Sequence, residues 1–209
     1  LPQLAEESDY GASGNYGLMD SLKAVEWVKE NIEGFGGDPE NITIGGQSGG
    51  TTKTSAFFAS KEGAALVDNV IWQTGLAFDN TYRTQEEMEA TSIAWLQECG
   101  LTGDETLEEL RAMDASVFMG KEEDYGKAPQ AMTTDGKYIQ YAGLEEAYAD
   151  GNFEGVNILV GSNLGEFTED GVGGHKMETA DEFYAYYKEL LGDLYDEYDF
   201  ENLVQVTDE

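Results

Sequence analysis

The stretch FGGDPENITIGGQSGG, residues 35–50, carries the strongest signal for the fold of this chain. Residues 41–44 are a short run rich in β-branched side chains, which predicts a buried strand. Glycines follow, and residues 51–60 have the composition of a helix. Ser48 therefore falls at a strand-to-helix turn, inside the pattern Gly-x-Ser-x-Gly. Such a turn lifts a serine side chain out of the sheet, and the flanking glycines let the strained backbone approach its neighbours closely.

Two interpretations of Ser48 are open at this point. In the first it is a catalytic nucleophile, which requires a base to take the hydroxyl proton. The N–H groups at the start of the following helix would then favour a developing oxyanion. In the second it is an incidental serine in a glycine-rich connection, because a motif stays a hypothesis until its structural context is confirmed.

Strands and helices alternate along the rest of the chain. This alternation predicts an α/β fold with a mostly parallel central sheet flanked by helices. Residues 1–17, 120–140 and 162–174 have the composition of loops. Further strands are expected at 70–73 and 157–161, and further helices at 18–32, 84–99, 104–119, 144–150 and 180–191.

The charge of the chain excludes several classes of partner. The net charge is −32, from 43 Asp and Glu against 11 Lys and Arg, so nucleic acids and anionic membrane surfaces should be repelled. No apolar run approaches the roughly 18 residues that a membrane span needs. With one cysteine and one histidine, the chain has no disulfide of its own and no metal site of the Cys/His kind.

Residues 35–50 also resemble the serine signature of the type B carboxylesterases, the carboxylesterase/cholinesterase group of α/β-hydrolases. The resemblance covers most of residues 14–75 and resumes over 161–167, where the sequence is GSNLGEF. It implies an α/β-hydrolase fold. It also implies that the protein is a serine esterase, which cleaves the carboxylic ester of a small molecule through an acyl-serine intermediate and uses no cofactor.

The resemblance implies roles for three residues. Ser48 is the nucleophile, Gly49 supplies a backbone N–H to the oxyanion, and Glu166 is the acid that orients a histidine. Two positions depart from the family pattern. Gln47 stands where the family usually has an acid, so an ion pair made by that acid is not expected here. Gly49 stands where the family often has alanine.

In the family, the catalytic histidine lies on the order of a hundred residues after the acid. The single histidine, His175, follows Glu166 by only 9 residues, so we expect it to be an exposed loop residue and the base to lie outside this chain. Residues 1–47 contain no oxyanion loop of the His-Gly-Gly type. We therefore expect one truncated domain over 1–209, without either end of the family domain and with a helical insertion at 76–140. The alternatives are a non-catalytic cholinesterase-like binding module and a truncated pseudoenzyme.

Overall fold

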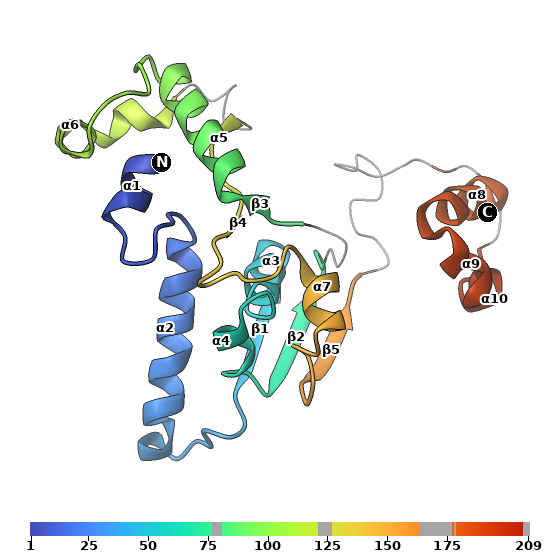
Figure 1. Ribbon diagram of the computed structural model, residues 1–209. Coiled ribbons are helices and arrows are strands. Elements are labelled where there is room, and N and C mark those ends of the chain that lie inside the picture. Colours follow the sequence, from blue (N-terminus) through green and yellow to red (C-terminus); the bar gives the residue numbers. More distant parts are fainter. Residues whose placement is uncertain (77–80, 121–126, 164–176, 178, 207–209) are drawn as a thin grey trace. The chain divides into compact units, whose positions relative to one another are not determined.

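The structure of the protein is a computed structural model (Figure 1). It divides into two compact units, Leu1–Ser162 and Asn163–Glu209. The residues that it describes are 1–76, 81–120, 127–163, 177 and 179–206.

A three-stranded parallel sheet organises the first unit, as the alternating pattern of the sequence predicts. The strands, in spatial order, are β1 (Thr43–Gln47), β2 (Asn69–Gln73) and β5 (Asn157–Gly161). Their last residues are level, because Gln47 pairs with Gln73 and Gln73 pairs with Gly161. All three carboxyl ends therefore lie at one edge of the sheet, where parallel α/β proteins usually bind their ligands.

One face of the sheet carries the hydrophobic core. Ile44, Val70 and Trp72 are buried on this face. Trp72 packs edge-to-face on Phe58 at 5.5 Å between ring centroids, and Phe58 stacks on Phe153 at 4.6 Å. Ile71 on the opposite face is exposed, and β5 is exposed along its whole length.

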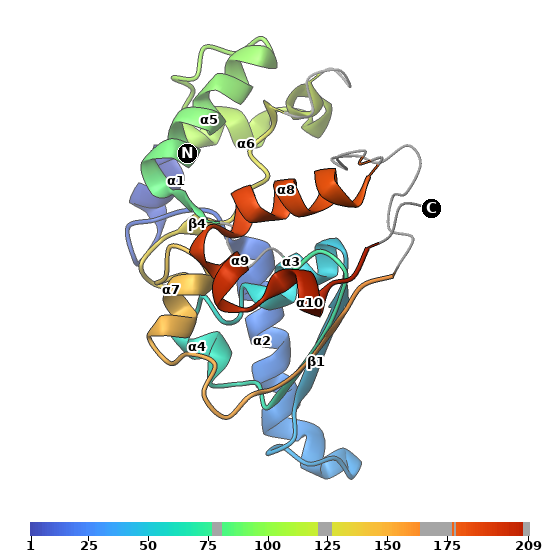
Figure 2. The same ribbon diagram turned by 90° about the vertical axis from the view of Figure 1, so that its right-hand side faces the viewer.

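Figure 2 shows α2, α3, α4 and α7 on the core side of the sheet. A separate parallel pair of two-residue strands joins β3 (Arg83–Thr84) to β4 (Thr133–Thr134). The helices of the first unit are α1 (Pro2–Glu7), α2 (Tyr16–Asn31), α3 (Gly49–Ser55), α4 (Lys61–Ala64), α5 (Gln85–Glu98), α6 (Leu107–Ala112) and α7 (Leu144–Ala149), with 3₁₀ helices η1 (Ile32–Phe35) and η2 (Ala115–Met119).

Several predicted elements have different bounds. The strand expected at 41–44 is β1, which begins at Thr43 and continues through the glycines to Gln47. Three others differ more. Residues 1–17 were expected to be loop, but α1 forms there, because Pro2 occupies the first turn and good helix formers follow it. The helix expected at 51–60 begins earlier and ends at Ser55, before a turn and α4. The helix expected at 104–119 is divided into α6 and η2, and the helix breaks at Met113, where the backbone is extended.

The second unit is a small helical cluster with an aromatic interior. Tyr187 stacks on Phe200 at 5.2 Å between ring centroids, and Phe183 lies 4.6 Å from Tyr187. The helix expected at 180–191 is confirmed with the same bounds. The helices are α8 (Ala180–Leu191), α9 (Asp193–Glu197) and α10 (Phe200–Leu203).

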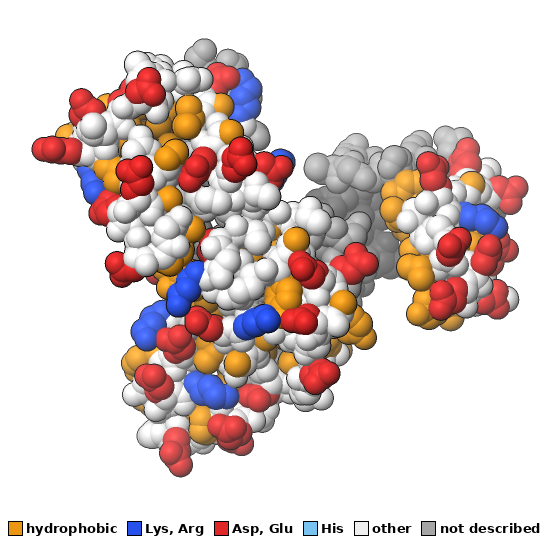
Figure 3. Space-filling model, viewed as in Figure 1, with side chains coloured by type: hydrophobic (Ala, Val, Ile, Leu, Met, Phe, Trp, Pro, Cys, Tyr) orange, Lys and Arg blue, Asp and Glu red, His pale blue; other side chains and the backbone are white. Residues whose placement is uncertain are grey.

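Acidic side chains dominate the visible surface, where Asp and Glu outnumber Lys and Arg (Figure 3). In the part of the chain that the structure describes, no helix has the length and apolar character of a membrane span. Within the same residues, no group of three or more His, Cys, Asp and Glu side chains is arranged to hold a metal ion.

Candidate active site

Ser48 lies between β1 and α3 in an unusual backbone conformation, with φ 53° and ψ −121°. Residues other than glycine rarely adopt a positive φ. A residue that does so raises the free energy of the folded state by about 1–3 kcal/mol through backbone strain. The residue is exposed, and its side chain makes no capping hydrogen bond to α3. The turn thus exposes the Ser48 hydroxyl, which does not cap α3, at the sheet edge where the carboxyl ends of the strands lie.

Backbone hydrogen bonds hold this strained turn on both sides. The Ser48 N–H donates to the carbonyls of Gln73, at 3.0 Å, and Thr74, at 3.1 Å. On the other side, the Ser48 carbonyl accepts from the N–H groups of Thr51, at 2.8 Å, and Thr52, at 3.2 Å. The strain is therefore compensated by contacts to β2 and to the first turn of α3.

The glycines around Ser48 differ in whether a side chain would fit at their position. A Cβ on Gly46 would lie 2.2 Å from the carbonyl carbon and oxygen of Gly50, so β1 and α3 can approach only with glycine at this position. A Cβ on Gly49 or on Gly50 would meet nothing within 4 Å. Gly46 is therefore required by packing, whereas Gly49 is not.

Thr51 lies beneath the turn and supports it, a role that was not predicted from the sequence. Its side chain is fully buried, and its Oγ1 lies 2.8 Å from the carbonyl oxygen of Gly46 and 3.2 Å from that of Gln73. The hydroxyl thus bridges β1 and β2 below Ser48. The feature of the sequence that could have indicated this role is a small hydroxyl residue in the first turn of the predicted helix.

A second turn of positive φ follows β2 and packs against the first. Thr74 has φ 55°, which is exceptional for a β-branched residue, and Gly75 has φ 87°. The Thr74 N–H donates to the Gly161 carbonyl at 2.8 Å, which ties β2 to the end of β5. A Cβ on Gly75 would lie 3.1 Å from the Ser48 Cα, so the two turns are in direct contact.

The structure places the other predicted site residues only in part. Gly49 is the first residue of α3, so its N–H has no acceptor within the helix. Glu166 and His175 lie outside the described residues. The strand that precedes Glu166, β5, ends at Gly161, level with Gln47 and two strand spacings away, or about 10 Å.

A cavity of about 310 Å³ lies beside the two turns, with Gly75 in its lining. Thr52 and Ser55 of α3 form part of its wall, together with Tyr82. Burial raises the pKa of Tyr82 to about 12, with a hydrogen bond to Ser55 acting in the opposite direction, so the phenol stays neutral at physiological pH. The cavity therefore offers a neutral lining next to the serine.

Comparison with known proteins identifies esterases among the relatives of this chain. The chain matches the model of the Carboxylesterase family over residues 4–197. It is 31% identical over 196 residues to the fumonisin B1 esterase of Sphingopyxis macrogoltabida, and 31% identical over 192 residues to the para-nitrobenzyl esterase of Bacillus subtilis. These alignments cover 92% and 86% of this chain, but 35% and 37% of the two relatives.

A solved structure shares the fold as well as the sequence. Over 90% of this chain and 40% of the other, the structure superposes on a thermophilic PNB esterase with a TM-score of 0.66 and 26% sequence identity. The parallel sheet flanked by helices is thus part of an α/β-hydrolase fold. The chain spans well under half the length of the relatives that it matches.

Proposed function

Because this chain belongs to the carboxylesterase family, we propose that it carries the nucleophile of a serine hydrolase that cleaves carboxylic esters of small molecules. The observation that carries the proposal is the backbone of Ser48, which holds φ 53° between a strand and a helix. Strain of this kind gathers at functional sites. The esterase names of the relatives support the class of substrate.

In the proposed reaction, the Ser48 Oγ attacks the ester carbonyl carbon while a histidine takes the hydroxyl proton. The Gly49 N–H donates to the oxyanion that forms, because no helix carbonyl competes for it. The tetrahedral intermediate collapses, the C–O bond breaks, and the histidine returns the proton to the departing alcohol. Water then attacks the acyl-serine in the same way and releases the carboxylic acid.

We assign the acid of this triad to Glu166. Its support is the resemblance of residues 161–167 to the family and the level ends of β5 and β1, which bring the two following segments to one edge of the sheet. A carboxylate there would hold the histidine in the required tautomer. We place that histidine outside these 209 residues rather than at His175, which follows Glu166 by 9 residues.

The test is covalent labelling of the natural gene product by a fluorophosphonate probe, which reacts with activated serines. We expect labelling of the wild-type protein and its loss in Ser48→Ala. The matched control is Ser116→Ala, an exposed serine whose Oγ donates to the Asp114 carboxylate and which lines neither described cavity. This control should label as the wild type does.

Equal labelling of Ser48→Ala would show that the nucleophile is a different residue. A natural product that neither labels nor hydrolyses para-nitrophenyl acetate, although it is folded by circular dichroism, would favour the non-catalytic alternatives. Loss of hydrolysis in Glu166→Gln with folding retained is the further expectation for the acid. Full activity of that variant would remove Glu166 from the mechanism.

A further inference from the structure

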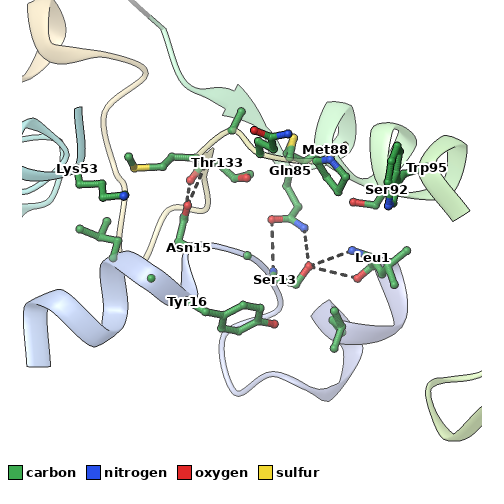
Figure 4. Close-up of a pocket in the computed structure, with 18 of the residues that line it drawn as sticks. Leu1, Ser13, Asn15, Tyr16, Lys53, Gln85, Met88, Ser92, Trp95 and Thr133 are labelled. Atoms are coloured by element: carbon green, nitrogen blue, oxygen red, sulfur yellow. Dashed lines mark hydrogen bonds between the residues drawn. The ribbon is translucent and has the colours of Figure 1, made fainter. Parts of the chain in front are cut away.

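A second and larger cavity lies in the first unit. Its volume is about 560 Å³, within the range of small-molecule sites. Its walls come from α1, the start of α2, α5 and residues 129–133 (Figure 4). Ser48, Gly49 and Gly75 are not in its lining, but Gln130, Ala131 and Met132 line both this cavity and the one beside Ser48, so the two cavities are neighbours.

Most of the lining is apolar. Leu18, Trp95 and Leu96 present buried side chains to the cavity, and Leu4, Met88 and Met132 add to the apolar part. A ligand must therefore have an apolar body, because burial of that body supplies the main driving force for binding.

The polar side chains in the middle of the lining already bind one another. The Gln85 Nε2 donates to the Ser13 Oγ at 3.2 Å, and the Ser13 Oγ lies 3.2 Å from the Leu1 carbonyl. The Asn15 Nδ2 donates to the Thr133 carbonyl at 2.7 Å, and its Oδ1 accepts from the Thr133 N–H at 2.9 Å. Figure 4 shows these bonds as dashed lines between the two sides of the cavity. These groups shape the cavity without needing a polar ligand.

Lys53 is different, because its ammonium group is not engaged. It projects from α3 and lies at the opposite end of the drawn lining from Trp95 (Figure 4). Within the described part of the chain, it forms neither an ion pair nor a hydrogen bond. By contrast, ion pairs with carboxylates are formed by Lys23, Lys61, Lys127, Lys137 and Lys188.

We propose that this cavity binds an anionic amphiphile with a single alkyl chain, such as a medium-chain carboxylate. The carboxylate pairs with the Lys53 ammonium, and the alkyl chain lies against Leu4, Met88 and Trp95. The two ends of the ligand match the two ends of the lining in Figure 4. The site requires no reaction at Ser48, so it stands independently of the proposed hydrolase activity.

The test is calorimetric titration of the full chain with decanoate, and separately with decanol, which has the same alkyl chain and no charge. The buffer should contain about 0.15 M salt, because a Debye length of about 8 Å screens the distant acidic groups while a contact ion pair persists. We expect Lys53→Gln to weaken decanoate binding about tenfold, which is the loss of one charge-assisted hydrogen bond. Decanol binding should not change.

Lys29→Gln is the matched control, because Lys29 also lacks an ion pair with the described residues and does not line the cavity. It should bind decanoate as the wild type does. If Lys53→Gln and Lys29→Gln weaken decanoate equally, or if the wild type does not bind decanoate, the assignment is wrong.

A second pair of variants tests the apolar end. Ser92 of α5 lines the cavity, and Ala94 on the same helix is exposed and does not. Ser92→Phe should fill the space and abolish binding of decanoate and decanol, whereas Ala94→Phe should leave both unchanged. Decanoate binding that survives Ser92→Phe in a folded protein would place the ligand elsewhere and overturn the proposal.

Discussion

Gly75 and Ser48 are in van der Waals contact across two adjacent turns, and a Cβ on Gly75 would lie 3.1 Å from the Cα and the carbonyl oxygen of Ser48. The contact is between backbones, so neither side can yield by a change of rotamer. The turn after β2 therefore forms part of the wall that fixes the serine.

Gly75→Ala should destabilise the first unit through this contact. Alanine at φ 87° costs about 1–2 kcal/mol by itself, and the tight approach to Ser48 should add about 1 kcal/mol. Gly36→Ala is a closely matched control, because Gly36 has the same φ of 87° and nothing within 4 Å of its Cβ position. Urea unfolding followed by tryptophan fluorescence measures both. If both variants lose the same free energy of unfolding, the contact between Gly75 and Ser48 does not contribute to stability.

Ser48→Gly should stabilise the protein although it removes the proposed nucleophile. Glycine adopts φ 53° without the steric cost, so we expect the free energy of unfolding to rise by about 1 kcal/mol. Ser48→Ala keeps the Cβ and should leave stability within about 0.5 kcal/mol of the wild type. Thermal and urea unfolding of the three proteins test this order. A Ser48→Gly protein less stable than Ser48→Ala would show that the turn is not strained.

Replacement by alanine should destabilise the protein strongly at Gly46 and hardly at all at Gly49. Gly46→Ala forces a Cβ into the backbone of Gly50 and should cost about 3 kcal/mol. Gly49→Ala meets open space at the start of α3 and should change stability by less than about 0.5 kcal/mol. If the full-length product is active, Gly49→Ala should also retain activity, because the backbone N–H remains. A large loss of stability in Gly49→Ala would contradict the structure.

Tyr82 should make the protein sensitive to alkali. Burial raises its pKa to about 12 in the folded state, whereas an unfolded tyrosine ionises near pH 10. Its contribution to the free energy of unfolding is therefore fully present below pH 10 and is lost as the pH rises from 10 to 12, by about 3 kcal/mol. Tyr82→Phe should reduce this loss, and the exposed-residue control Tyr16→Phe should not. Parallel alkaline profiles of Tyr82→Phe and the wild type would refute this assignment.

The sequence predicted the elements with strong local signals and missed the others. The strand at 157–161 and the helix at 180–191 have their predicted bounds, since the first is a continuous apolar run and the second is amphipathic and begins after the capping residue Thr179. The strands β3 and β4 have two residues each, too few to show an alternating pattern. They form because tertiary contacts bring distant segments together.

The position of Ser48 could be predicted, but its surroundings could not. The glycine pattern placed it at a strand-to-helix turn, which the structure confirms. The left-handed backbone of Thr74 carries no sequence signal, because threonine normally avoids that region and only neighbouring strands impose it. The burial of Thr51 beneath the turn likewise depends on the closeness of β1 and β2.

The level ends of β1, β2 and β5 have a consequence for engineering. The distance between the segment after Gln47 and the segment after Gly161 is set by backbone hydrogen bonds, and side-chain replacements along the strands leave it unchanged. A deletion of one residue in β5 would instead move its end by about 3.3 Å and turn its side chains to the opposite face. The segments that follow β1 and β2 pack backbone against backbone, so an exchange with a relative has to move these two segments together and keep the length of each strand.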